Sequence, residues 1–288
     1  MQQPKLEVHL LGRIDARIEG KPVRIGGRHA QALLALLVLE PQPRSRETIA
    51  VDLWPDNPNA TASLRQALWH LRTAIVAAGG DPDAFILADA ESIGLVPGAQ
   101  VVTDVAAFEA LARGRTRDPE AAAGLYAGDH ATGYGHECFA IERERLADIF
   151  EDTLAEIAER RLAAGRMDEA RATAERLLAR DPLREEAHAV LIGVHGRTGS
   201  RAQIVRQYRR LVAVLRRELD VDPLPETEVV YRTAMASVVE RSRLRLVAAG
   251  FVRRDAGPST LPLGLSTGTA HLGALAGRRS STGVSTPA

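Results

Sequence analysis

The sequence has one cysteine and no apolar run long enough to cross a membrane. The single thiol, Cys138, excludes an internal disulfide and fits a reducing compartment. The first residues, MQQPKLEVHLLG, lack the charged-then-apolar layout of a signal peptide. No segment approaches the roughly 18 consecutive apolar residues that a membrane helix needs. We therefore expect a cytoplasmic protein that does not associate with a membrane.

The chain also lacks an excess of charge of either sign. It has 37 Lys and Arg against 37 Asp and Glu. These divide as 10 against 11 in residues 1–100, 20 against 25 in 101–240, and 7 against 1 in 241–288. Because the chain is not a polycation, any binding of nucleic acid must depend on local basic patches.

Acidic residues are missing from one long segment, Asn57 to Gly80, NPNATASLRQALWHLRTAIVAAGG. At 100° per residue its apolar side chains fall on one arc of a helix. The opposite face carries polar and aromatic side chains, which are Arg65, Gln66, Trp69, His70, Arg72 and Thr73. Phosphates repel acids, whereas base edges accept hydrogen bonds from guanidinium and amide groups. The segment is therefore a candidate DNA-reading helix, although a solvated helix face without acids gives the same pattern.

Trp69 does not fit a purely polar DNA-reading face. Its ring either stacks on a sugar or a thymine methyl group, or packs under a neighbouring hairpin, and packing is the interpretation we favour. Arg65 and Arg72 lie on one shoulder of the predicted face and His70 on the other.

The elements around this segment predict a winged helix-turn-helix in residues 1–100. Residues 5–25 alternate apolar and polar positions between glycines, as short strands do. A buried helix is expected over 28–39, and a second helix, capped by Ser45, up to about Trp54. Residues 85–97 read as a β-hairpin, the wing, whose turn around Asp89–Ser92 would lie near the minor groove. Arg44 and Arg46, at the start of the second helix, are candidate phosphate contacts.

From about Asp104 the pattern becomes helical and repetitive. Gly165 and Gly199 are 34 residues apart, and the sequences after them align as GRMDEARATAERLLA and GSRAQIVRQYRRLVA. A period of 34 with glycine between paired helices is the spacing of tetratricopeptide repeats. We expect an all-α domain over 101–240, followed over 241–288 by a basic helix end and a disordered tail. The expected fold class is thus multidomain, an α+β winged helix followed by tetratricopeptide-like helices.

The sequence resembles bacterial activators of the antibiotic-regulatory-protein (SARP) type, which join a response-regulator-like winged helix to a bacterial transcriptional activator domain. The resemblance covers about residues 5–238. It is carried by GRHAQALLALLVLEP, SRETIAVDLWPD and SLRQALWHLRTAI, and most specifically by RDPLREEAH and LRRELDVDPLPET. It implies binding to promoter DNA, recruitment of RNA polymerase, and a helical domain that supports formation of a homodimer.

Motifs for other chemistry are missing. The only Gly-Lys pair, Gly20-Lys21, precedes a proline and forms no phosphate loop, and no segment has the alternating strands and helices of a receiver domain. No nucleophile-elbow pattern is present, so we expect no enzyme activity and no cofactor. Metal-capable side chains gather only in Asp129, His130, His136, Glu137 and Cys138. Because their spacing matches no recurrent site, we favour a polar connection over a metal site there.

Two functions from different classes follow. The favoured one is a sequence-specific DNA-binding regulator, an activator that binds promoter repeats and contacts RNA polymerase. The alternative is a tetratricopeptide-like interaction scaffold with a winged helix that does not bind DNA. The near-neutral charge of residues 1–100 favours the scaffold, whereas the acid-free helix favours the regulator.

Overall fold

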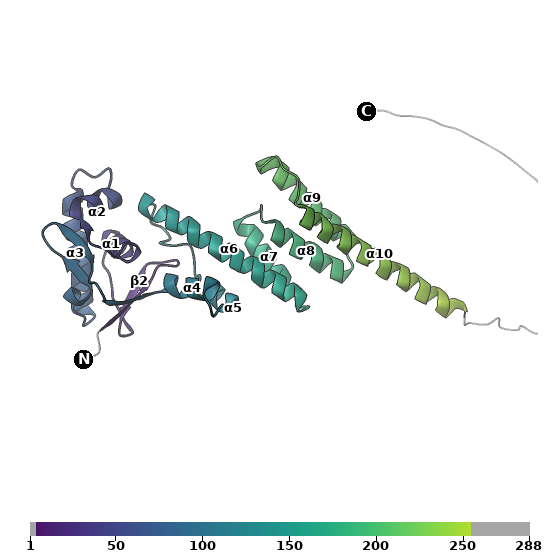
Figure 1. Cartoon of the computed structure of the whole chain (residues 1–288), viewed down its shortest axis with the longest axis horizontal. Helices are drawn as coiled ribbons and strands as arrows, with labels where there is room; N and C mark the ends of the chain where they lie inside the picture. The colour runs from purple at the N-terminus through teal and green to yellow at the C-terminus, as the bar shows by residue number, and fades with distance from the viewer. Residues whose placement is uncertain (1–3, 255–288) are drawn as a thin grey trace, which may run out of the picture. The chain divides into compact units, whose positions relative to one another are not determined.

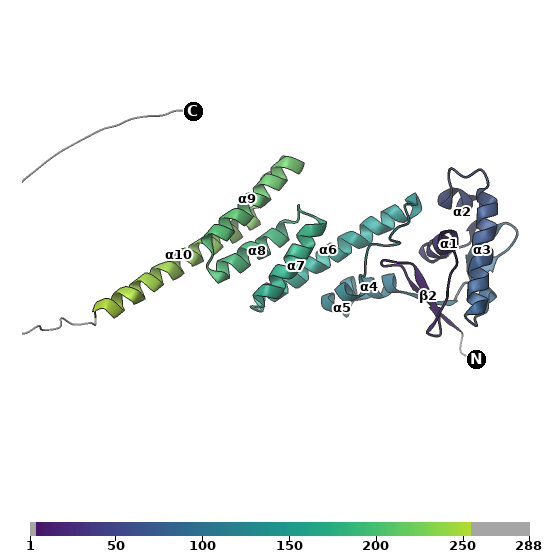
Figure 2. The same ribbon diagram turned by 180° about the vertical axis from the view of Figure 1, so that it is seen from behind.

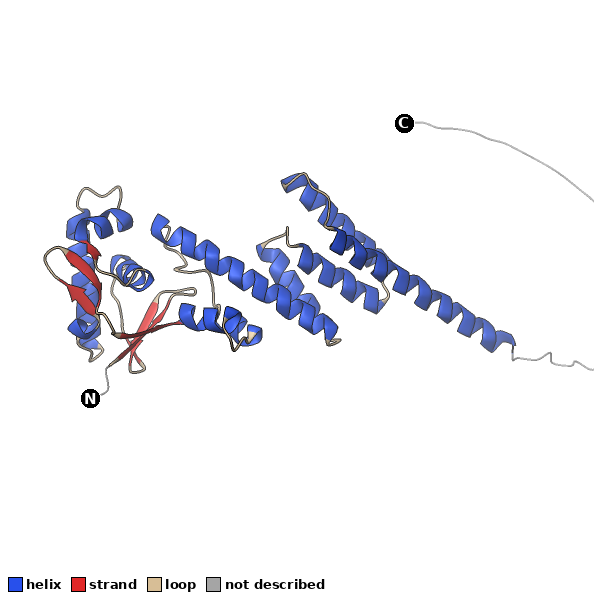
Figure 3. Cartoon of the chain, viewed as in Figure 1, coloured by secondary structure: helices blue, strands red, loops and turns tan. Residues whose placement is uncertain are grey.

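The computed structural model describes residues 4–254 of the chain. The contacts group residues up to Ser242 into one compact unit, and the fold described below is that of this unit. It begins with two small sheets and a three-helix cluster and continues as a series of helices (Figures 1 and 3). Within residues 4–254, no helix is both long and apolar enough to cross a membrane.

The first sheet has four strands in the order β3-β2-β1-β7. These are β1 (Lys5–His9), β2 (Asp15–Ile18), β3 (Lys21–Pro22) and β7 (Gln100–Thr103). The alternation in β1 places Leu6 and Val8 on the buried face, as the sequence predicts. The strand β7, which pairs in parallel with β1, was not predicted. This pairing places the segment that follows the wing beside the first strand of the chain.

Three helices follow, α1 (Arg28–Leu39), α2 (Arg46–Leu53) and α3 (Ala60–Ala77). The predicted bounds of the first helix are confirmed, since α1 runs from Arg28 to Leu39 and ends before the prolines, with most of its residues from Ala30 to Leu37 buried. The predicted cap of α2 is also confirmed, because the Ser45 hydroxyl accepts a hydrogen bond from the Thr48 amide at 3.0 Å. Both α1 and α2 pack against α3.

The wing is a three-stranded sheet in the order β4-β6-β5. The predicted hairpin is present as β5 (Ile86–Ala88) and β6 (Ser92–Leu95), preceded by the short helix η1 (Pro82–Ala84). The third strand, β4 (Arg44–Ser45), was not predicted and pairs with β6. Gly94 lets these backbones approach, since a Cβ there would lie 2.7 Å from the Pro43 Cα atom. Because β4 directly precedes α2, its pairing with β6 holds the wing next to the start of α2.

The helical part begins with α4 (Asp104–Arg113) and α5 (Pro119–Leu125), and the one-turn helix η2 (Glu137–Phe139) leads into its long helices. These are α6 (Ala140–Ala163), α7 (Met167–Arg180), α8 (Glu185–Thr198), α9 (Arg201–Glu218) and α10 (Pro225–Arg254). Successive helices from α6 to α9 pack side by side (Figure 2).

The helices α7 and α8 form one pair, and α9 and α10 form the next. The glycines that predicted the repeat, Gly165 and Gly199, both have left-handed backbones, with φ of 78° and 84°. The aligned positions also agree, because Leu177 of α7 and Leu211 of α9 are both fully buried. The 34-residue period therefore marks real helix pairs. The basic residues expected to extend the last helix lie in α10, whereas the tail after Arg254 lies outside the described residues.

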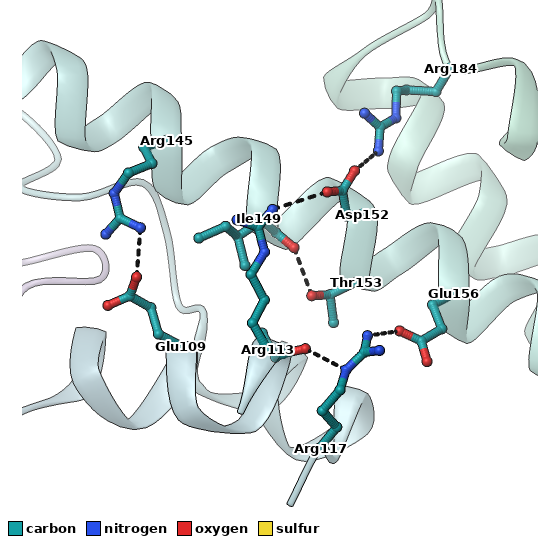
Figure 4. A network of polar contacts seen from close by, with 10 residues as sticks. Glu109, Arg113, Arg117, Arg145, Ile149, Asp152, Thr153, Glu156 and Arg184 are labelled. Carbon is teal, nitrogen blue, oxygen red and sulfur yellow. Dashed lines mark hydrogen bonds and ion pairs between the residues drawn. The ribbon is translucent and has the colours of Figure 1, made fainter. Parts of the chain in front are cut away.

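Arginine–carboxylate pairs connect α4 and α6 along their lengths (Figure 4). Arg145 of α6 contacts Glu109 of α4 at 2.6 Å. One turn further along α4, Arg113 donates a hydrogen bond to Asp152 of α6 at 3.2 Å, and Asp152 also accepts one from Arg184 at 2.6 Å. The many charges of this region are thus largely engaged with one another. Each exposed pair contributes only about 0.2–1 kcal/mol, so their joint effect is to fix how the helices align.

The connection between α5 and α6 packs onto the first sheet and α1. Ala131 donates its amide to the Leu10 carbonyl at 2.8 Å, and Leu11 forms a β-bridge with His130. The side chains of Tyr134 and Phe139 lie in the same apolar core as α1 and α3. The connection therefore belongs to the core of the winged helix, whereas α4 to α8 pack around a second core of their own.

Candidate nucleic-acid interface

The acid-free segment forms α3, whose two faces divide as the sequence predicts. Leu64, Leu71 and Ile75 are at most 1% exposed and pack in the core. Arg65, Gln66 and Thr73 are exposed on the opposite face. His70 is half-buried on the shoulder, near the loop at Gly26 that precedes α1. The face thus offers guanidinium, amide and hydroxyl groups to a partner.

Trp69 lies in the middle of this face, and its side chain is 62% exposed. Its ring makes an edge-to-face contact with His70, with the ring centroids 4.8 Å apart. The prediction that Trp69 packs under the wing is therefore wrong, because the wing turn does not cover the ring. An exposed indole has an apolar body and one N–H donor, which suits a surface that meets a partner.

Arg72 is held by a carboxylate from outside the helix. Its guanidinium contacts the Asp83 carboxylate of η1 at 2.7 Å, and the Arg72 side chain is 33% exposed. Asp83 follows α3 by a few residues and so brings an acid to the edge of an acid-free face. Reading the helix by itself could not reveal this neighbour.

The start of α2 and the wing turn are joined around Arg46. The Arg46 amide donates to the Glu91 carbonyl, and its side-chain Nε donates to the Asp89 carbonyl, both at 2.9 Å. The Asp89 carboxylate accepts from the amides of Glu91 and Ser92, and these hydrogen bonds lower the pKa of Asp89. The Asp89 carboxylate thus stabilises the turn of the wing. Within residues 4–254 the two terminal nitrogens of Arg46 have no hydrogen-bond partner and are available to bind a phosphate.

Arg44, the other predicted phosphate contact, is flanked by acids. Its guanidinium lies 3.0 Å from Glu40 and 2.5 Å from Asp52, and its side chain is only 21% exposed. Two carboxylates therefore compete with any phosphate for this group, and of the two predicted contacts Arg46 is the better placed.

A shallow groove runs between α3, the start of α2 and the wing turn. Three of its lining residues, Thr61, Leu68 and Ala90, were not predicted as DNA contacts. The groove is lined by Arg46, Thr61, Arg65, Leu68, Trp69, Arg72 and Ala90. Among the side chains that the structure describes, none forms an ion pair with Arg65. The groove therefore has a cationic lining with an aromatic ring in its middle, as surfaces that bind phosphates and bases have.

The metal-capable residues of the connection do not gather around one point. Asp129 accepts from the Tyr126 hydroxyl at 2.9 Å and from Arg180 at 2.6 Å, and the buried His130 ring packs against Phe139. Burial and the nearby Asp52 raise the pKa of Cys138 to about 11, which keeps its thiol protonated. Within residues 4–254, no three such side chains are placed to bind a metal ion. The metal alternative therefore has no support in the described part of the chain.

Comparison with known proteins identifies the helical part. Residues 103–234 match the family model of the bacterial transcriptional activator domain. The transcriptional regulatory protein EmbR of Mycobacterium tuberculosis is 28% identical over 239 residues, which are 77% of this chain and 61% of that protein. The same protein from Mycobacterium bovis is equally similar. The chain thus spans about three fifths of the length of these curated relatives.

A solved structure shares the fold. Mycobacterium tuberculosis EmbR in complex with a low affinity phosphopeptide superposes with a TM-score of 0.62 and 23% identity, and the match covers 88% of this chain and 71% of that one. Both the small α+β region and the helices of the activator domain have counterparts in that fold. Residues 103–234 thus match a bacterial transcriptional activator domain, and the chain is similar to the transcriptional regulatory protein EmbR.

Proposed function

We propose that the chain binds promoter DNA sequence-specifically and, as a homodimer or on paired sites, recruits RNA polymerase. The observation that carries the proposal is the groove beside α3, where Arg65 and Trp69 of this acid-free helix lie next to Arg46 at the start of α2. Arg and Gln on such a helix suit guanine and adenine edges, and Thr or Arg suits phosphates.

In this proposal α3 enters the major groove. Arg65, Gln66, His70, Arg72 and Thr73 would contact bases or nearby phosphates, and Trp69 would stack on a sugar or a thymine methyl group. Arg46 would bind a phosphate at the start of α2, beside the wing turn. Because few cations act here and Asp83 opposes one of them, a single copy should bind weakly, which favours paired sites.

The test is a titration of DNA from the chain's own promoter region with the full chain. Binding is measured by fluorescence anisotropy at several salt concentrations. We expect Arg65→Ala to weaken binding by about fivefold or more and to reduce the salt slope by about one unit. The matched control is Arg209→Ala, which removes an exposed arginine from α9. The proposal is wrong if the wild-type chain fails to bind DNA at low salt, or if Arg65→Ala and Arg209→Ala have the same DNA affinity and salt slope. Either result would favour the interaction scaffold.

A further inference from the structure

The outward face of α9 carries arginines and contains no acid. Apart from its last residue, Glu218, this helix has no Asp or Glu. Arg206, Arg209 and Arg210 are exposed and fall within one arc of about 100°. We call these three side chains the arginine face of α9. Ile204 and other apolar side chains are buried on the opposite side, where α9 packs against α8 and the first part of α10 (Figure 2).

A fourth arginine meets this face from α7. Arg171 and Arg206 both act on His195 of α8. Burial lowers the pKa of this histidine, the two positive charges lower it further, and Glu175 raises it. The Nε atom of Arg171 and the Nδ1 atom of His195 are buried, and neither has a hydrogen-bond partner within residues 4–254. Because a buried guanidinium N–H without an acceptor is unfavourable, this part of the surface suits an anionic oxygen.

Fewer acids than arginines surround the arginine face. Glu175 and Glu185 each act on the pKa of a histidine of α8. On α10, Glu228 pairs with Arg232 at 3.1 Å, so these two residues add no net charge. The arginine face and Arg171 together therefore set four positive charges against two negative ones. Such a surface attracts an acidic partner.

The end of α9 does not share this excess. Arg216 pairs with Asp222 at 2.8 Å and Arg217 with Glu218 at 2.7 Å, and Asp220 also lies near Arg216. Among the described residues these are the ion pairs of α9, and the arginine face forms none. The positive surface is thus confined to the first part of the helix.

The shape of the face favours a helix as the partner. Ala202 and Ala213 are exposed and lie in the middle of the arc that the three arginines occupy. Small side chains there let a second helix approach closely, and arginines three and four residues apart match acids at the same spacing on that helix. Surfaces that bind DNA phosphates usually add hydroxyl and amide groups to their arginines, and this arc carries neither.

We propose that the arginine face of α9, together with Arg171, binds an acidic α-helix of a partner protein. Carboxylates on one side of that helix pair with Arg206, Arg209 and Arg210, and one of them accepts a hydrogen bond from the Nε atom of Arg171. The inference goes beyond the proposed function and does not depend on it, because DNA takes no part in this contact. A protein bound in this way would leave the DNA-reading face of α3 free.

The experiment titrates the full chain into a labelled synthetic helix of Glu, Ala and Leu, with its glutamates three and four residues apart, and follows fluorescence anisotropy at low salt. We expect Arg206→Glu and Arg210→Glu each to weaken binding about tenfold, and the double variant more. The matched control is Arg24→Glu, which makes the same change of charge at an exposed arginine before α1 and should have little effect. A peptide of the same composition with its glutamates in one block should bind more weakly.

Several results would overturn the assignment. The wild-type chain may not fail to bind the helical peptide, and the double variant may not keep the wild-type affinity. Equal weakening by Arg24→Glu, or equal affinity for the block peptide, would show that only overall charge acts. An equal loss of affinity for an unrelated DNA duplex would show that the face binds nucleic acid instead. If Arg206→Glu lowers the thermal midpoint, Arg206→Gln replaces it, and an unchanged peptide affinity then has the same meaning. Failure to bind promoter DNA would refute the proposed function and leave this inference standing.

Discussion

Replacing Asp83 with Asn should strengthen DNA binding. In the free protein the Asp83 carboxylate holds Arg72 at 2.7 Å and so competes with phosphate for the same guanidinium. The two side chains are 33% and 73% exposed, and exposed pairs of this kind contribute about 0.2–1 kcal/mol. Release of Arg72 should therefore tighten the complex by about 1.5- to 5-fold at low salt. The gain should shrink as salt rises, because screening already weakens the ion pair.

The assay is fluorescence anisotropy with promoter DNA, and it requires the same substitution in an Arg72→Ala background. If Arg72 is the competing group, the gain disappears in that background. An equal gain in both backgrounds would mean that Asp83 acts only through the overall charge. Unchanged or weaker binding by Asp83→Asn, while Arg65→Ala still weakens the complex, would refute the reasoning. Little change in stability is expected, because the Asp83 carboxylate pairs with Arg72 at the surface.

Three further predictions concern stability and are measured by urea and thermal unfolding of the full chain. Ser45→Ala removes the hydrogen bond to the Thr48 amide and should lower the free energy of unfolding by about 1 kcal/mol. Leu177→Ala opens a cavity at a fully buried position of α7 and should cost about 2–5 kcal/mol, whereas Leu219→Ala, at an exposed position, should cost little. Burial lowers the pKa of His188 below its ordinary value of 6.5, so the folded state resists protonation there. Stability should therefore fall as the pH drops below about 6.5, and His188→Gln should weaken this dependence; an unaltered pH profile would contradict it.

Features set by short-range spacing could be predicted from the sequence. The bounds of α1 follow from an apolar run stopped by prolines, and the cap of α2 follows from a serine three residues before a threonine amide. The buried and exposed faces of α3 follow from 100° per residue. The helix pairs follow from two glycines at the period of one repeat.

Features that depend on distant residues could not be predicted. The strands β4 and β7 are short, and their pairing depends on partners far along the chain. No pattern within α3 shows that Asp83 reaches Arg72, or that the wing leaves Trp69 uncovered. The DNA-contacting residues named from the sequence remain predictions. The structure shows that Arg44 and Arg72 already pair with acids, so we expect Arg46 and Arg65 to contribute more to DNA binding.

The connection from Gly128 to Phe139 has a practical consequence for dissecting the molecule. A fragment that ends near residue 100 would lose Tyr134 and Phe139 from the core it shares with α1 and α3. It would also leave the Leu10 carbonyl without its partner, the amide of Ala131. A fragment made to test DNA binding by the winged helix should therefore extend to about the start of α6. A cut near residue 100 would yield a destabilised domain, and weak binding by that domain would say nothing about the intact chain.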